Sequence, residues 1–329
     1  MFDVMLPRII EAFTRGDGGA VGYDSMFLLY GHAGTRKAEI MFGRESGWGV
    51  LPQICDAVFR ARDARNEETS FVLTASVVEL RWDDCFDLLD GRTECVIDTE
   101  GTPLASKLVL NSMEDLKRLL SSLEGKYPCS TMSDECPEDD DDCSRSHVAF
   151  IFTLLQMDFE SGDYTKTTFS LLDLAYAERP HKTDQEHLDF LNAVMELRMF
   201  NGLSKDEKPG AVINYELQKI RMSPVRASKE YASGALEKFH PDGSNAVIRF
   251  LSGCFTGKAM LNMAVILSEA GQNGWDTWFS LQCGADFGKL QIPVCHVKVQ
   301  HFAKVLKRTL AALKKSKLAL AKRPGRLCE

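Results

Sequence analysis

The sequence lacks the features that define several protein classes. No run of about 18 apolar residues occurs in the 329-residue chain, so no membrane-spanning helix is expected. The first residues show no basic stretch followed by an apolar run, so we expect no secretory signal. The ten cysteines form no CxxC pair, which disfavours zinc and favours reduced thiols in a cytoplasmic protein. With 44% hydrophobic and 26% charged residues, the balance is that of a globular protein.

Acidic residues are missing from one segment of a chain whose net charge is −8. From Lys298 to Arg326 there are ten lysines and arginines and no aspartate or glutamate. Such a basic tail on an acidic body predicts an acidic partner. Residues 299–320 form a predicted amphipathic helix, whose apolar face holds Phe302, Val305, Leu306, Leu310 and Leu313. The helix would bind an acidic protein partner, an anionic membrane or a partner helix, or its apolar face would dock on the body; nucleic acid is disfavoured.

Hydrophobic periodicity predicts an α/β fold. Short apolar runs indicate strands at residues 26–30, 71–80, 147–157, 167–174 and 259–267. Helical spacing indicates helices at residues 3–16, 50–64, 111–123, 186–200, 246–251 and 276–290. This alternation predicts a mostly parallel central sheet with helices on both faces. Residues 204–243 are expected to be polar and irregular, with a helix at 228–239, and residues 134–142, with seven acidic side chains, to form a solvated loop.

A glycine-rich turn follows the first predicted strand. Its pattern is close to the phosphate-binding loop G-x-x-x-x-G-K-[ST], in which backbone N–H groups and a lysine bind phosphate oxygens. Gly31 and Lys37 match the pattern, whereas Arg36 replaces the second glycine and Ala38 replaces the serine or threonine. The first change puts a long side chain where the backbone must approach phosphate, and the second removes a magnesium ligand. Contact between the Arg36 guanidinium and an anion is an alternative that stays open.

Six segments together resemble the kinesin motor domain family, in its order and spacing. They are residues 30–43 (YGHAGTRKAEIMFG), 49–59, 76–89, 144–147 (SRSH), 173–179 (DLAYAER) and 276–286. The resemblance covers residues 2–291 and implies a kinesin-like P-loop NTPase fold whose first strands are absent from this chain. Residues 1–291 are then a motor-like domain with an insertion near 203–240, and residues 292–329 a neck-like strand and basic tail. The alternating residues 292–299 would cover the open edge of strand 259–267; alternatively, the chain is part of a longer protein.

The resemblance also assigns the candidate site. The vestigial phosphate loop consists of Gly31, His32, Ala33, Gly34, Thr35, Arg36, Lys37 and Ala38. The switch I remnant is Ser144, Arg145, Ser146 and His147, and the switch II remnant is Asp173, Tyr176 and Glu178. Tyr176 stands where the family has the glycine that meets the terminal phosphate. Arg145 and Glu178 match a salt bridge of the family, which is here either a surviving latch between the switches or an ion pair that holds two loops.

The microtubule-facing candidates are Lys182 and Arg249. The insertion carries basic residues that would either rebuild a microtubule contact or lie in a solvated loop. We assign no catalytic residue, no metal site and no cofactor.

The resemblance, with its losses at the phosphate loop, predicts a kinesin-like cytoskeletal protein. It would be a pseudo-motor in the cytoplasm, binding tubulin in microtubules or another kinesin-like subunit, with lost or strongly impaired ATP hydrolysis. The alternative is a divergent microtubule motor with weak ATP and magnesium binding and a weak ATPase. A third reading is an interaction domain for a partner other than tubulin.

Overall fold

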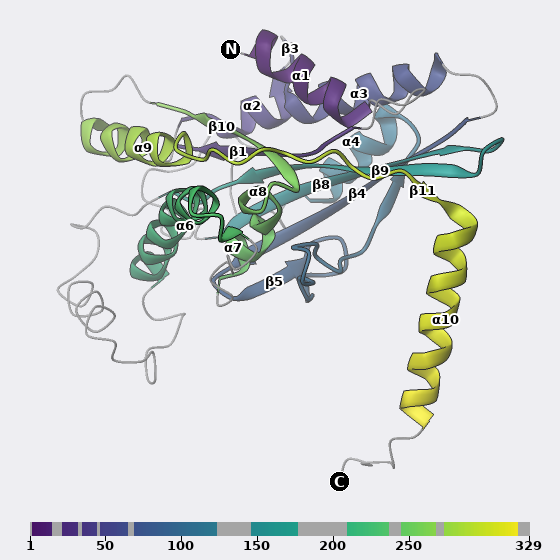
Figure 1. The fold of residues 1–329 in the computed structure, drawn as a ribbon. Coiled ribbons are helices and arrows are strands. Elements are labelled where there is room, and N and C mark those ends of the chain that lie inside the picture. Colours follow the sequence, from purple (N-terminus) through teal and green to yellow (C-terminus); the bar gives the residue numbers. More distant parts are fainter. Residues whose placement is uncertain are drawn as a thin grey trace.

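The computed structural model describes residues 2–14, 22–31, 35–44, 47–64, 69–123, 146–176, 209–236, 245–267 and 273–321. The predicted helix at 186–200 and the acidic stretch at 134–142 lie outside them. A nine-stranded sheet separates two groups of helices (Figure 1). Its strands are β1 (Asp24–Tyr30), β4 (Thr69–Arg81), β5 (Asp84–Asp87), β6 (Thr93–Glu94), β7 (Leu108–Leu110), β8 (His147–Asp158), β9 (Asp163–Asp173), β10 (Ala259–Val265) and β11 (Gln300–His301). A separate small hairpin joins β2 (Gly43–Arg44) to β3 (Gly47–Trp48).

The sheet is mixed, so the α/β class is confirmed but the expectation of a mostly parallel sheet is wrong. The strand order is β10-β1-β9-β8-β4-β5-β6, with β7 beside β4 and β11 beside β9. Only the pairings of β1 with β10 and with β9 are parallel among those described. The long strands β9, β8 and β4 pair antiparallel. A four-residue turn joins β8 to β9, which is too short for the crossover that a parallel pair needs.

Side chains on the two faces of the sheet build two cores. Alternate residues of β1 point to opposite sides, so Phe27 and Leu29 enter one core and Met26 and Leu28 the other. One face is covered by α1 (Phe2–Thr14), α2 (Lys37–Phe42), α3 (Val50–Asp63) and α4 (Met113–Ser122), and the other by α6 (Pro209–Ala232), α7 (Ala246–Phe250), α8 (Ser252–Phe255) and α9 (Gly274–Phe287) (Figure 1).

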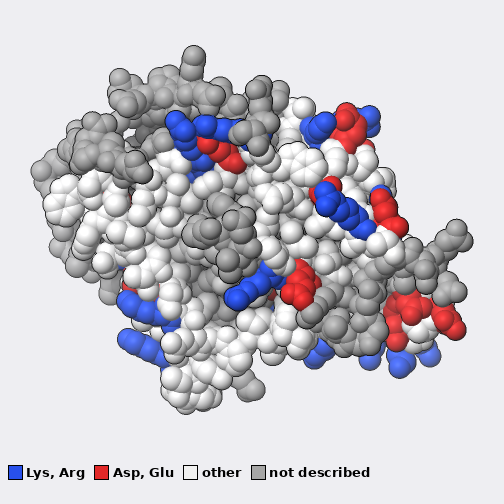
Figure 2. Space-filling model, turned by 90° about the horizontal axis from the view of Figure 1, so that it is seen from above, with Lys and Arg blue, Asp and Glu red and all other residues white. Residues whose placement is uncertain are grey.

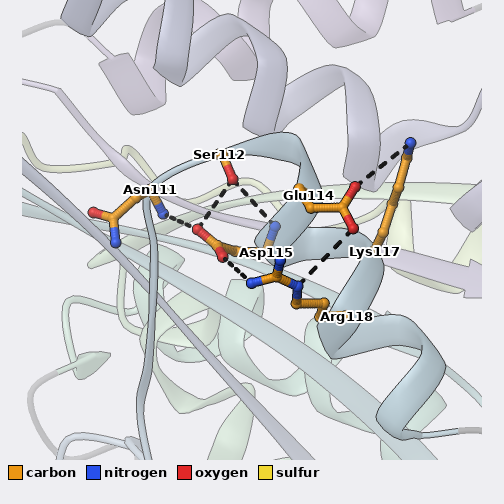
Figure 3. A network of polar contacts seen from close by, with 6 residues as sticks. All are labelled: Asn111, Ser112, Glu114, Asp115, Lys117 and Arg118. Atoms are coloured by element: carbon orange, nitrogen blue, oxygen red, sulfur yellow. Dashed lines mark hydrogen bonds and ion pairs between the residues drawn. The ribbon is translucent and has the colours of Figure 1, made fainter.

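The predicted helix at 111–123 is confirmed as α4, and its start is capped. The Ser112 hydroxyl accepts a hydrogen bond from the Asp115 backbone N–H at 3.3 Å (Figure 3). The Asp115 carboxylate in turn accepts from the Asn111 backbone N–H at 2.9 Å. One N–H of the first helical turn and the N–H of the residue before the cap are thereby satisfied.

The expectation that residues 204–243 are irregular is wrong. The 24-residue helix α6 fills much of this stretch. Ile213, Leu217, Ile220 and Ala227 are buried at helical spacing against the sheet. Pro209 occupies the first helical position, where its missing N–H costs nothing, while Pro224 lies within the helix. The polar composition and the two prolines concealed this apolar stripe.

Residues 292–299 do not cover the edge of β10, so that expectation is wrong too. Within the described residues, β10 pairs with β1 alone. The segment instead crosses the amino-terminal ends of β10 and β1, because Cys295 N–H donates to Gly257 O at 2.8 Å and Val297 N–H donates to Gly22 O at 2.9 Å. The chain then joins β9 through β11. Alternating burial here reflects an extended chain lying across strand ends rather than a sheet strand.

The predicted amphipathic helix of the tail is confirmed as α10 (Phe302–Ala321), which projects from the body (Figure 1). Its apolar face is not docked on the part of the body that the structure describes, contrary to that interpretation. Phe302, Leu306, Leu310 and Leu313 are 44–51% exposed. Across the described residues, no helix is both long and apolar enough to span a bilayer.

Candidate functional site

The turn after β1 has a geometry that only glycine fits at its first position. Gly31 directly follows β1, and a Cβ there would lie 2.6 Å from Ile266 O and 2.8 Å from the Thr35 hydroxyl. No side chain other than hydrogen fits at this position. His32, Ala33 and Gly34 lie outside the described residues, and Thr35 is buried at the end of the turn.

Lys37, the first residue of α2, is buried and held by the protein itself. Its Nζ donates to Gly31 O at 3.2 Å and to Leu174 O at 3.0 Å. The same Nζ lies 3.3 Å from Asp173 Oδ1 at the end of β9, and both side chains are less than 10% exposed. An ammonium has three donors, and these three oxygens are near enough to take all of them. Lys37 therefore ties the phosphate-loop region to the neighbouring strand.

Arg36 adopts the backbone conformation for which the family pattern uses glycine. It precedes α2 with φ 58° and ψ 40°, in the left-handed region, and makes no side-chain cap. Its side chain is 68% exposed and contacts Glu39 at 3.6 Å. A residue with a Cβ is strained there, by about 1–2 kcal/mol. Ala38, in the first turn of α2, offers no hydroxyl.

Arg36→Gly is expected to raise the free energy of unfolding by about 0.5–1 kcal/mol, because relief of the strain exceeds the entropy cost of glycine. Arg92 provides the matched contrast, with φ 64°. Its guanidinium holds the buried Glu79 by hydrogen bonds of 2.7 and 3.1 Å, so Arg92→Gly should destabilise. Urea unfolding of both variants checks the pair, and a loss of stability in Arg36→Gly would contradict the strain.

The switch remnants are only partly described. Ser146 and His147 are buried at the start of β8, and Tyr176 is half-buried beyond β9. Ser144, Arg145 and Glu178 lie outside the described residues, as does Lys182. The Arg145–Glu178 pair therefore stays a prediction.

His147 belongs to a buried polar chain whose other members the sequence did not reveal. Its Nδ1 accepts from Ala175 N–H at 3.0 Å, which places the ring proton on Nε2. Nε2 lies 3.4 Å from Glu216 Oε2, longer than an ordinary hydrogen bond, and both side chains are 0% exposed. Asn245 Nδ2 donates to Glu216 Oε1 at 2.9 Å, and Asn245 Oδ1 caps Ile248 N–H at 2.9 Å. The start of β8 is thus linked to α6 and α7.

One feature of the sequence indicates that Glu216 is a buried and paired carboxylate. It lies between Ile213 and Leu217 on the buried face of α6, and a charged residue on such a face is rare unless it is paired. Because an irregular segment was expected here, no helix was predicted on which the spacing of these three residues could be interpreted.

Arg249, the other microtubule-facing candidate, is held against the body. It lies on α7, and its guanidinium donates to the Asp83 backbone carbonyl. On the face seen over α1 and α3, basic and acidic side chains lie side by side (Figure 2). On α3, Arg60 pairs with Asp56 at 2.8 Å and Arg62 with Asp63 at 2.9 Å. The view shows no large basic patch among its described residues.

A buried lysine at the start of a helix, after a strand and a glycine turn, and an aspartate at the end of the neighbouring strand define a P-loop NTPase fold. Comparison with known proteins narrows this class to one family. The family model "Kinesin motor domain" matches residues 18–196, more than half of the chain. The chain belongs to the kinesin motor domain family.

Individual relatives are similar at modest identity. Human "Kinesin-like protein KIF13B" is 27% identical over 275 residues, covering 79% of this chain and 14% of that protein. Mouse "Kinesin-like protein KIF13A" is 26% identical over 314 residues, 92% of this chain and 17% of that protein. Rat "Kinesin-like protein KIF1A" is 30% identical over 177 residues, 49% of this chain and 10% of that protein. The chain thus spans less than a fifth of these relatives.

Proposed function

We propose that this chain is a kinesin-like microtubule- or partner-binding module that has lost ATP hydrolysis or retains it only weakly. The supporting observation is the Lys37 ammonium, which lies 3.3 Å from the buried Asp173 carboxylate and is held by two backbone carbonyls. A lysine that contacts outer phosphates must leave these partners and expose a carboxylate to the nucleotide.

The residues around Lys37 do not fit magnesium–ATP in the manner of a P-loop. Ala38 lacks the hydroxyl that would bind magnesium, and Arg36 fills the glycine position with a long side chain. Tyr176 stands at the position of the glycine that meets the terminal phosphate. We therefore assign no catalytic step to these side chains.

Steady-state ATP turnover with and without microtubules tests this proposal. We expect release of phosphate at the rate of a buffer control in both conditions, with matched protein concentrations and an active kinesin motor as the positive control. A clear stimulation by microtubules would overturn the proposal and favour a divergent motor. The retained strand, Gly31 turn and Lys37 at the start of α2 support that second candidate.

We further propose that α10 recruits an acidic partner. Lys304, Lys307, Arg308 and Lys314 are exposed on this helix, beside the undocked apolar face. No acidic side chain on α10 offsets their charge. Tubulin is the favoured partner because its acidic tails complement both the charge and the family's function; another kinesin-like subunit is the alternative.

Lys304→Gln/Lys307→Gln/Lys314→Gln in the full chain is expected to weaken microtubule co-sedimentation about tenfold, because three charges of ~0.5 kcal/mol each are removed. Lys117→Gln/Lys166→Gln/Lys258→Gln changes the net charge equally on the body, outside the insertion near 203–240, and serves as the control. The tail-dependent binding should fall steeply as salt rises. Equal losses in the two triple variants would argue against a role for α10.

A further inference from the structure

Two cysteine thiols lie in contact on the hairpin formed by β5 and β6. Cys85 lies in β5, and Cys95 directly follows β6. The pairing of Phe86 with Glu94 makes these cysteines the next opposed residues, and Cys95 N–H donates to Cys85 O at 2.8 Å. Their sulfur atoms are 3.2 Å apart, the distance of a thiol hydrogen bond. Directly opposed residues on antiparallel strands lie within the range that a disulfide spans.

The two thiols are not equivalent. Cys85 is 2% exposed, whereas Cys95 is half-buried and can be reached from solvent. The hydrogen bond from the Cys85 thiol lowers the pKa of Cys95, because it stabilises the thiolate. The same hydrogen bond, together with burial, raises the pKa of Cys85. Cys95 is therefore suited to react first, and Cys85 keeps its proton as the second thiol.

None of the other described cysteines has a hydrogen bond to a second described thiol. Burial raises the pKa values of Cys254 and Cys283 to about 12, and it also raises the pKa of Cys55. Cys295 is exposed. In the part of the chain that the structure describes, Cys85 and Cys95 are the one pair of cysteines joined by a thiol hydrogen bond.

We propose that Cys85 and Cys95 form a redox pair that hydrogen peroxide converts to a disulfide. The Cys95 thiolate attacks one peroxide oxygen, the O–O bond breaks, and the departing oxygen takes a proton to form water, leaving Cys95 as a sulfenic acid. The Cys85 sulfur then attacks the Cys95 sulfur, the S–O bond breaks, and the hydroxyl leaves as water with the Cys85 proton. Overall, two thiols and one hydrogen peroxide give one disulfide and two waters.

The hairpin that carries the two cysteines is held by contacts to β4 and α7. Arg92, between the two cysteines, already binds Glu79 of β4 at 2.7 and 3.1 Å and closes the hairpin against the sheet. Asp83, immediately before β5, accepts the hydrogen bond from Arg249 of α7. Oxidation therefore adds a covalent, reducible link two residues from Asp83, the hydrogen-bond partner of Arg249, one of the residues considered for the microtubule-facing surface.

Peptide mapping of the full chain tests the proposal. The native protein is treated with hydrogen peroxide, blocked with N-ethylmaleimide and digested with trypsin, which separates the two cysteines by cleavage after Arg92. We expect a linked Cys85–Cys95 peptide pair that dithiothreitol releases, with Cys254 and Cys283 still reduced. Cys85→Ser should leave a Cys95 sulfenic acid that dimedone traps, and Cys295→Ser should behave as the unchanged chain.

Peptide mapping of the unchanged chain tests the proposal even if Cys85→Ser fails to fold. The absence of the linked peptides at peroxide concentrations that oxidise Cys295 would overturn the proposal. Linkage of Cys95 mainly to another cysteine would overturn it as well, as would linkage between two chains rather than within one.

Discussion

His147→Ala is expected to lower the free energy of unfolding by about 3–5 kcal/mol, because it leaves the Glu216 carboxylate buried beside an empty space. Both side chains are completely buried, so water cannot replace the lost contact without opening the packing of α6 against β8. Equilibrium unfolding in urea measures this loss, and an unchanged slope of the transition would show that the change lies in stability.

Two further variants separate the buried charge from simple loss of volume. The double variant His147→Phe/Glu216→Leu should recover much of the stability, because it removes both polar groups and keeps the space filled. Asp56→Ala breaks the exposed Asp56–Arg60 pair on α3 and should cost about 0.3–0.5 kcal/mol. If His147→Ala were as mild as Asp56→Ala, the buried polar chain would not stabilise the fold.

Lys37→Met is expected to destabilise the fold by a comparable amount, about 3–5 kcal/mol. Methionine keeps the length of the side chain but removes the positive charge beside the buried Asp173 and both hydrogen bonds to backbone carbonyls. In an active P-loop, the same change mainly removes phosphate binding. Thermal and urea unfolding without nucleotide measure the structural role directly.

The exposed Lys117→Met is the matched control and should change stability by less than about 0.5 kcal/mol. Adding Asp173→Asn to Lys37→Met should restore part of the loss, because the buried carboxylate is then uncharged. A folded Lys37→Met of unchanged stability would contradict the proposed structural role of this lysine.

Local patterns predicted most elements but not how the strands pair. The strands β1, β4, β8, β9 and β10 and the helices α3, α4, α7 and α9 were predicted near their observed places, because their apolar spacing is regular. The direction of pairing depends on connections, and the turn between β8 and β9 forces an antiparallel arrangement that alternation with helices did not indicate.

The candidate site was predictable where it follows a motif and hidden where it depends on tertiary contacts. The motif gave Gly31, Lys37 and Asp173, and the structure brings Lys37 and Asp173 together at 3.3 Å. Glu216 and Asn245 belong to no motif, since they matter only because α6 and α7 pack against the start of β8. Arg36 was recognised as a departure, but its left-handed backbone required coordinates.

The proposal that the nucleotide site no longer functions depends most directly on whether the chain binds magnesium–ATP. Titration calorimetry with ATP at millimolar magnesium, on the full chain, measures this without needing turnover. We expect no heat of binding at protein concentrations of ~100 μM, which places any Kd in the millimolar range or weaker. Micromolar affinity that is lost without magnesium and abolished by Asp173→Asn would contradict the proposed loss of nucleotide chemistry and identify the chain as a divergent motor.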